Sequence, residues 1–427
     1  LTEISGDYGH GTVLCGSGNL TVSGGIYLVK RDVDVRGSGK IKLIGTGAGC
    51  KGIIGNLTVN GGTLDITVTG QNRCGIYASY KSITIPAGTV TVTAKGAGIK
   101  GIEARQCDFQ VSGSGKLTVK AEGDSSYNST AYAVWAPHTT IHVSGGGTFD
   151  ITGKQVNRGI YWAMLDVDGG TLNINLTRTG DDESVYGVEY YGTTHFVKNG
   201  GKLNINIEAD AGSYVVGIKD TALEVDETST ATIKVKSDGD VCAAVLERLN
   251  CDGTINLTAE SGKETATAGD GVNLTVEGKG TLTATAKGSE YAQPFGEVTF
   301  NGTDGAKPLT VNTHATVTAK IGTAYLNNST VNTQGNVNIT REVASVPGAE
   351  ARGLRASLNV GHTAGYITLR TVAGTTLANE LAGVVNYEPA NFAVTGNPKG
   401  KDFVTYTAIS ADAPMISNSS GGAVTLY

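Results

Sequence analysis

One phrase recurs along the chain at a nearly constant interval. Residues 169–180 read GGTLNINLTRTG, and residues 200–212 read GGKLNINIEADAG. In each copy a Gly, or an Ala in degenerate copies, precedes apolar residues at alternate positions. The copies begin at Gly39, Gly62, Gly88, Gly115, Gly147, Gly170, Gly201, Ala231, Gly253, Gly280, Ala315 and Gly335. Their mean spacing is roughly 27 residues, a period typical of a solenoid.

Apolar and polar side chains alternate strictly within a copy. In one copy, Leu64 and Ile66 alternate with Thr63, Asp65 and Thr67. A period of two with one apolar face predicts a half-buried β-strand. One such strand cannot bury its apolar face alone, so neighbouring copies must cover each other.

Two further short segments complete each repeat. A Gly-Ile or Gly-Val step follows the first strand, as at Gly75-Ile76 and Gly101-Ile102, and a third segment closes the repeat, as in SITIPAG at 82–88. Gly, Asn and Asp turns separate the three segments. The repeat therefore predicts an all-β chain folded as a parallel β-helix (β-solenoid), with about 12 coils of roughly 27 residues and three short strands per coil.

The repeat also sets the expected domain boundaries. We expect an N-terminal cap or first coil at 1–38, the parallel β-helix at 39–360, and a C-terminal β cap or attachment segment at 361–427, where the repeat fades. Caps are expected because the end of a solenoid exposes unpaired strand edges. The chain begins at Leu1 without a Met or a signal-like apolar segment, which we interpret as a processed or excised piece.

Composition narrows the classes of partner. The net charge is −6 and Lys and Arg are scattered, so we expect no nucleic-acid partner. No run of eighteen apolar residues occurs, so we expect no membrane span. The six cysteines lack zinc-type spacing. Cys50 and Cys74 hold the same place in successive repeats, and we expect buried free thiols, with disulfides as the alternative.

The phrase GGTLDITVTG at 61–70, followed by CGIYASYKSITI at 74–85, resembles right-handed β-helix proteins of bacterial surfaces that bind carbohydrate. The resemblance covers about 39–360 and concerns coil architecture. It implies a right-handed parallel β-helix, related in fold to pectate lyases, and an extracellular or cell-surface location. Some members of the family bind cellulose-like or pectic polysaccharides with calcium. The matching positions here are structural Gly, Thr and aliphatic residues, so no catalytic residue is carried over.

The second segment of each repeat provides a distinctive outward column. Stacked aromatic rings there could cover the apolar faces of a sugar chain, while Glu and Arg bond its hydroxyls. The candidate sugar-binding residues are Tyr77, Glu103, Arg105, Tyr132, Trp135, Arg158, Tyr161, Glu189 and Tyr191. The alternative is that these side chains only pack on a solvated sheet face. Strict alternation would point Trp162 and Tyr190 inward.

Acidic residues gather near the turns that close the third segment. Hard cations favour stacked carboxylates, so calcium is a candidate ligand, although Asp is also an ordinary turn residue. The candidate calcium ligands are Asp168, Asp226, Asp252 and Glu277. No other cofactor is expected.

Enzymatic function is not favoured. A polysaccharide lyase or hydrolase needs converging carboxylates or a base, and only Glu103 with Arg105, or Glu189, would qualify. We therefore expect an extracellular, non-catalytic solenoid for adhesion or for binding a polysaccharide or cell-surface glycan on a bacterial surface. A structural fibre or phage-fibre subunit that associates end to end is the alternative, and a polysaccharide lyase or hydrolase is the second alternative.

Overall fold

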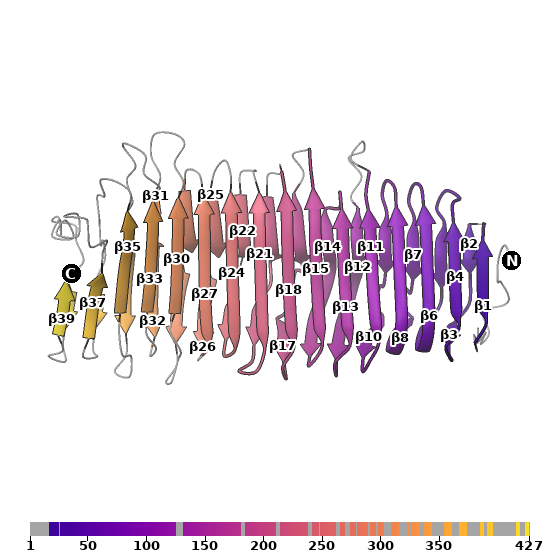
Figure 1. Cartoon of the computed structure of the whole chain (residues 1–427), viewed down its shortest axis with the longest axis horizontal. Helices are drawn as coiled ribbons and strands as arrows, with labels where there is room; N and C mark the ends of the chain where they lie inside the picture. The colour runs from indigo at the N-terminus through magenta and orange to yellow at the C-terminus, as the bar shows by residue number, and fades with distance from the viewer. Residues whose placement is uncertain are drawn as a thin grey trace. The chain divides into compact units, whose positions relative to one another are not determined.

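The computed structural model is all-β, with parallel strands stacked as a β-solenoid (Figure 1). It describes residues 17–24, 26–124, 131–180, 184–210 and 214–237, and from 241 onward mainly the strands. The chain divides into two compact units, one formed by 1–211 with 218–221 and the other by 212–217 with 222–427. The fold class predicted from the repeat is thus confirmed.

In the first unit, the repeated phrase forms one continuous column of parallel strands. The column comprises β1 (Asn19–Ser23), β4 (Lys40–Gly45), β6 (Leu57–Thr69), β8 (Ser82–Lys95), β11 (Lys116–Glu122), β13 (Thr148–Lys154), β15 (Thr171–Arg178) and β18 (Lys202–Ala209). Equivalent positions of the repeat face each other, so that Leu64 pairs with Val90 and Val90 with Leu117. All three side chains are buried, as the alternation predicts.

The other two sides of each coil in this unit form their own columns. The second column contains β2 (Tyr27–Val29), β5 (Lys51–Ile54), β7 (Cys74–Tyr77), β9 (Lys100–Glu103), β12 (Tyr132–Ser144), β14 (Arg158–Asp168) and β16 (Val185–Glu189). The third contains β3 (Val33–Val35), β10 (Asp108–Ser112), β17 (His195–Lys198) and parts of β6, β8, β12 and β14. Four strands therefore continue around a corner, whereas the sequence predicted three separate strands in every coil.

The second unit continues the same parallel pairing. Its strands are β20 (Leu223–Val225), β21 (Thr230–Ser237), β22 (Val241–Leu246), β23 (Leu249–Cys251), β24 (Thr254–Ser261), β25 (Thr265–Gly269), β26 (Leu274–Gly278), β27 (Thr281–Gly288), β28 (Tyr291–Phe295), β29 (Val298–Gly302), β30 (Leu309–Ala315), β31 (Thr323–Ala324), β32 (Leu326–Thr333), β33 (Val337–Val343), β34 (Leu354–Val360), β35 (Ile367–Ala373), β36 (Val385–Tyr387), β37 (Asn391–Thr395), β38 (Ile416–Asn418) and β39 (Ala423–Leu426). Residues of β19 (Tyr214–Lys219) belong to both units. Parallel pairs such as β35 with β37 and β37 with β39 lie beyond residue 360, where the sequence repeat fades.

The number of turns differs slightly from the expectation. The solenoid has about nine turns, compared with the roughly twelve coils that the repeat predicted. The roles of 1–38 and 361–427 as caps stay predictions, because residues 1–16 and much of 361–427 lie outside the described residues.

The core is a stack of aliphatic side chains with aromatic and thiol groups at a few positions. Phe109 and Phe149 are fully buried, and their ring centroids lie 5.6 Å apart. The cysteines that the structure describes are buried and free, as expected: Cys50, Cys74, Cys107, Cys242 and Cys251. Cys74 N donates a hydrogen bond to Cys50 O at 3.0 Å, which places the two in successive coils. Cys15 lies outside the described residues.

The Gly of the Gly-Ile step is explained by the close approach of the next coil. A Cβ atom on Gly75 would lie 2.7 Å from Gly101 O and 2.2 Å from Val92 Cγ1. A Cβ atom on Gly101 would lie 2.6 Å from Ala133 O. Only a residue without a side chain fits these positions without displacing a neighbouring coil.

Candidate ligand-binding face

The outward side chains of β5, β7, β9, β12, β14 and β16 form a surface that we call the second-strand face. Tyr77 pairs with Glu103, Glu103 with Trp135, Trp135 with Tyr161, and Tyr161 with Glu189. These five candidate residues therefore form one column, with one side chain from each successive coil. Parallel pairing holds the backbones of adjacent members about 4.8 Å apart, across the strands.

A second row runs beside this column, three residues earlier in each strand. Register places Lys100 beside Tyr132, Tyr132 beside Arg158, and Arg158 beside Tyr186. Two further candidates, Tyr132 and Arg158, thus lie next to the column. Tyr186 is buried, with Arg158 Cζ 4.1 Å and Lys219 Nζ 4.6 Å from its ring centroid.

Lysines cover two of the aromatic rings in the column. Lys51 Nζ lies 3.5 Å from the centroid of Tyr77, and Lys100 Nζ lies 3.9 Å from the centroid of Trp135. Lys100 Nζ also forms an ion pair with Glu103 Oε2 at 2.9 Å. These cation–π contacts stabilise the rings in place. A sugar that stacked on the same face of Trp135 would have to displace the Lys100 ammonium.

Farther along the face, aromatic rings stack on each other. Tyr132 and Tyr161 have centroids 5.2 Å apart, and Tyr161 and Trp162 have centroids 5.3 Å apart. The expectation that Trp162 points inward is wrong, because its side chain is 38% exposed. Its φ of 63° is left-handed, so the backbone leaves the alternation of an extended strand at this residue. Tyr190 is half-buried, and its ring lies 6.0 Å from that of His195.

Glu189 is the centre of a polar cluster at the β16 end of the face. Its side chain is almost completely buried and forms ion pairs with Arg158 and, at 3.2 Å, with Lys219 Nζ. Tyr191, which is 58% exposed, donates a hydrogen bond from its hydroxyl to Glu189 Oε1 at 3.0 Å. Two cations and a hydroxyl therefore hold this carboxylate, as a buried charge requires. Burial and the nearby Glu189 carboxylate raise the pKa of the Tyr161 hydroxyl.

Arg105 lies apart from the column. Its side chain is exposed, and its guanidinium carbon lies 5.9 Å from the centroid of Tyr80. Tyr80 is itself highly exposed and has a φ of 56°, which marks a corner of the coil. The structure therefore gathers Tyr77, Glu103, Tyr132, Trp135, Arg158, Tyr161, Glu189 and Tyr191 along one face and leaves Arg105 at its edge.

The first two candidate calcium ligands contact residues of their own turn or of the neighbouring coil. Asp168 lies 3.7 Å from Lys198 Nζ and accepts a hydrogen bond from Asn199 Nδ2 at 2.7 Å. Asp226 Oδ1 accepts from the backbone N of Thr228 at 3.0 Å and from its hydroxyl at 2.9 Å, as an Asx turn does.

The other two candidate ligands lie in the second unit. The backbone N of Asp252 donates to Val225 O at 2.9 Å, and Glu277 pairs with Asn250, although the Glu277 side chain lies outside the described residues. Within the described part of the chain, no three His, Cys, Asp or Glu side chains group in a way that could hold a metal ion.

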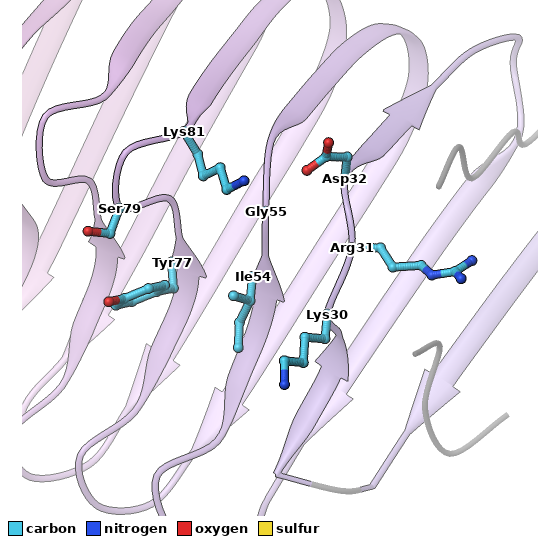
Figure 2. Close-up of a pocket in the computed structure, with 8 residues that line it drawn as sticks. All are labelled: Lys30, Arg31, Asp32, Ile54, Gly55, Tyr77, Ser79 and Lys81. Carbon is cyan, nitrogen blue, oxygen red and sulfur yellow. The ribbon is translucent and has the colours of Figure 1, made fainter. Parts of the chain in front are cut away.

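A small pocket opens at the β2 end of the second-strand face (Figure 2). It has a volume of about 50 Å³ and is lined by Lys30, Arg31, Asp32, Ile54, Gly55, Tyr77, Ser79 and Lys81. Figure 2 shows Lys81 and Asp32 extending toward each other near Gly55, whereas Arg31 points away. Asp32 Oδ1 accepts a hydrogen bond from Asn56 N at 2.8 Å. Of the sequence candidates only Tyr77 lines this pocket. Ile54 holds the equivalent position in β5, and the remaining lining residues lie between strands, where the sequence carries no repeated motif.

We compared the chain with known families, proteins and structures. No family model, no curated protein and no solved structure matches the chain. In the described part of the chain, no helix has the length and apolarity needed to cross a membrane. The structure shows the β-solenoid arrangement that the resemblance implied.

Proposed function

We propose that this chain is a non-catalytic β-solenoid that binds a polysaccharide or cell-surface glycan along its second-strand face. The observation that carries the proposal is the in-register column from Tyr77 to Glu189, in which the coils from Tyr77 to Tyr161 each present one aromatic or charged side chain and the buried Glu189 ends the column. The resemblance to bacterial surface proteins supports an extracellular location and a role in adhesion.

The arrangement suits an extended ligand. A polymer lying along the column would meet a new side chain at each coil, about every 4.8 Å. The exposed Tyr191 donates a hydrogen bond to Glu189, and the exposed Trp162 stacks on Tyr161, whose ring lies 5.9 Å from the Arg158 guanidinium carbon. Such a mixture of rings and hydrogen-bonding groups suits sugars.

The carboxylates on this face are held by cations, which disfavours catalysis. Glu103 is paired with Lys100, and Glu189 is held by Arg158 and Lys219. A general base must be free to take a proton from the substrate, and a pair of acids must converge on one bond. Neither carboxylate meets these requirements, so binding without turnover is the better proposal.

A structural fibre or spacer is the second candidate, and one observation favours it. Lys51 and Lys100 already occupy ring faces of Tyr77 and Trp135, so two aromatic rings of the column have intramolecular partners where a sugar would stack. Under this alternative the side faces bind nothing specific, and the chain associates end to end with other copies.

Glycan binding tests the main proposal directly. The native chain should bind at least one polysaccharide from a panel of plant, host and microbial glycans. Trp135→Ala and Trp162→Ala should each weaken that binding about tenfold, as truncation of an aromatic hot spot typically does. Phe196→Ala removes a half-buried aromatic ring from β17, on another side of the coil, and should leave binding unchanged. Binding to no glycan in the panel would favour the fibre.

Calcium stays a prediction of the sequence. If the ion binds only the folded chain, removing it with a chelator should lower the melting temperature by mass action. An unchanged melting curve in chelator would eliminate calcium as a cofactor.

A further inference from the structure

We propose that the pocket beside Tyr77 is a subsite for an anionic substituent, a carboxylate or a sulfate ester, on the bound glycan. This inference rests on the proposed function and adds to it the class of ligand, an acidic polysaccharide. It is carried by the distribution of paired and unpaired cations along the second-strand face together with the geometry of the pocket.

Cations in the middle and at the β16 end of the face have carboxylate partners. Lys100 pairs with Glu103 at 2.9 Å, and Arg158 and Lys219 both pair with Glu189. At the pocket end, by contrast, Lys51 and Lys81 form no ion pair with any residue that the structure describes. Carboxylates thus neutralise Lys100, Arg158 and Lys219, whereas Lys51 and Lys81 beside Tyr77 have no such partner among the described residues.

One of the two unpaired lysines lines the pocket, and the other contacts the aromatic ring of a residue that lines it. Lys81 lines it and extends over Gly55, and Lys51 Nζ lies on the ring of Tyr77, which forms another wall (Figure 2). Ser79 adds a hydroxyl to the lining, and Ile54 adds an apolar surface. A ligand group there would meet ammonium and hydroxyl donors beside an aromatic ring.

The size of the pocket matches a substituent better than a whole sugar ring. Its volume is about 50 Å³, and one water molecule needs roughly 10–15 Å³ on a comparable measure. A carboxylate or sulfate ester, with three to five heavy atoms, fills such a space, while the sugar that carries it remains outside on the column.

Asp32 does not cancel the positive charge of the pocket. Its carboxylate is anchored by the hydrogen bond from Asn56 N. Even with the Arg31 side chain directed away, the lining contains two lysines, Lys30 and Lys81, and this single carboxylate, while Lys51 lies on the ring of Tyr77. The chain as a whole carries a net charge of −6, so the pocket is a local reversal of sign that would attract an anionic ligand.

The test uses one sugar backbone with three substitutions. Binding of neutral, carboxymethylated and sulfated cello-oligosaccharides is measured by calorimetry for the native chain, Lys51→Gln, Lys81→Gln and Lys202→Gln. At least one anionic oligomer should bind the native chain more tightly than the neutral oligomer. Lys51→Gln and Lys81→Gln should each weaken that anionic binding about fivefold, the effect of one exposed ion pair. Lys202→Gln removes the same charge from an exposed position on β18 and should have no effect.

The outcomes separate this inference from the proposed function. Equal binding of all three oligomers, or equal losses in Lys81→Gln and Lys202→Gln, would overturn the anionic subsite and leave glycan binding intact. A dependence on the two lysines for only one anionic oligomer would identify the group as carboxylate or sulfate. If none of the oligomers binds and the broader glycan panel is also negative, the proposed function fails and the subsite fails with it.

Discussion

His195 is the residue whose environment differs most from that of a free side chain. It is fully buried, its Nδ1 accepts a hydrogen bond from Leu165 N at 3.1 Å, and its Nε2 has no hydrogen-bond partner among the residues that the structure describes. Burial lowers the pKa of His195 from 6.5 to about 3. The folded chain therefore keeps this imidazole neutral at pH values where the unfolded chain protonates it.

This difference predicts a loss of stability in acid. As the pH falls below about 6.5, the unfolded state takes up a proton that the folded state cannot, so His195 lowers the free energy of unfolding by about 1.4 kcal/mol per pH unit down to about pH 3. His195→Asn keeps an acceptor near Leu165 N but does not titrate. Urea unfolding between pH 7 and pH 4 should show a shallower pH dependence for this variant, and the exposed His138→Asn should behave like the native chain.

An identical pH dependence in His195→Asn and the native chain would contradict this prediction. It would mean that the imidazole already reaches solvent, or a partner, in the folded state.

Single residues also show how far the sequence predicted the candidate site. Alternation was sufficient to place Tyr77, Trp135 and Tyr161 in one column, because a parallel stack keeps equivalent positions in register. It failed at Trp162, where a left-handed backbone conformation turns the ring outward. Neither the lysines over the rings nor the pocket at Lys81 could be predicted, because they depend on side-chain conformations and corner geometry rather than on strand periodicity.

At the scale of the strand, the glycines of the second column allow neighbouring coils to pack closely. Gly75→Ala places a methyl group against Val92 and the Gly101 carbonyl. We expect this overpacking to cost about 1–3 kcal/mol of unfolding free energy. Gly18→Ala is the matched control, because no atom lies within 4 Å of its Cβ position. Thermal melting of both variants measures the difference, and equal melting temperatures would show that the coils can separate at no cost.

The buried aromatic pair tests the inward face of the strands. Phe149→Ala removes a fully buried ring that packs against Phe109. The cavity left behind should cost about 3–5 kcal/mol of unfolding free energy. Chemical denaturation of this variant beside Phe196→Ala, which loses a half-buried ring, should show the larger loss for Phe149. A loss of less than 1 kcal/mol would mean that the core collapses around the vacated volume.

The sequence predicted the type and register of the strands better than it predicted where the strands end. The alternation around Leu64 and Leu172 predicted the first column correctly, because one buried face fixes the register of a strand. The continuation of β6 and β8 around a corner was not predicted. Gly62 and Gly88 mark turns in the sequence, but their positive φ angles of 65° and 78° bend the backbone within one strand, and the β6–β8 pairing resumes after a register shift at this corner.

At the scale of the whole array, stability should be local. Each coil contacts mainly its two neighbours, so the first unit behaves as a series of nearest-neighbour interactions rather than as one globular core. Phe149→Ala in β13 should therefore raise hydrogen exchange most in β11, β13 and β15 and progressively less toward β4. Exchange mass spectrometry of peptides from each strand measures this gradient. A uniform rise along the unit would indicate one cooperative core instead.

The in-register pairing also has an evolutionary consequence. The inward row of one coil fits the inward row of another, since Leu117 pairs with Phe149 and Phe149 with Leu172. A tandem duplication of residues 148–170 would create a junction that repeats an existing one, because Gly170 would precede Thr148 as it now precedes Thr171. Recombination between repeats can thus lengthen or shorten the gene product by whole coils, and so add or delete ligand positions, without redesigning the core.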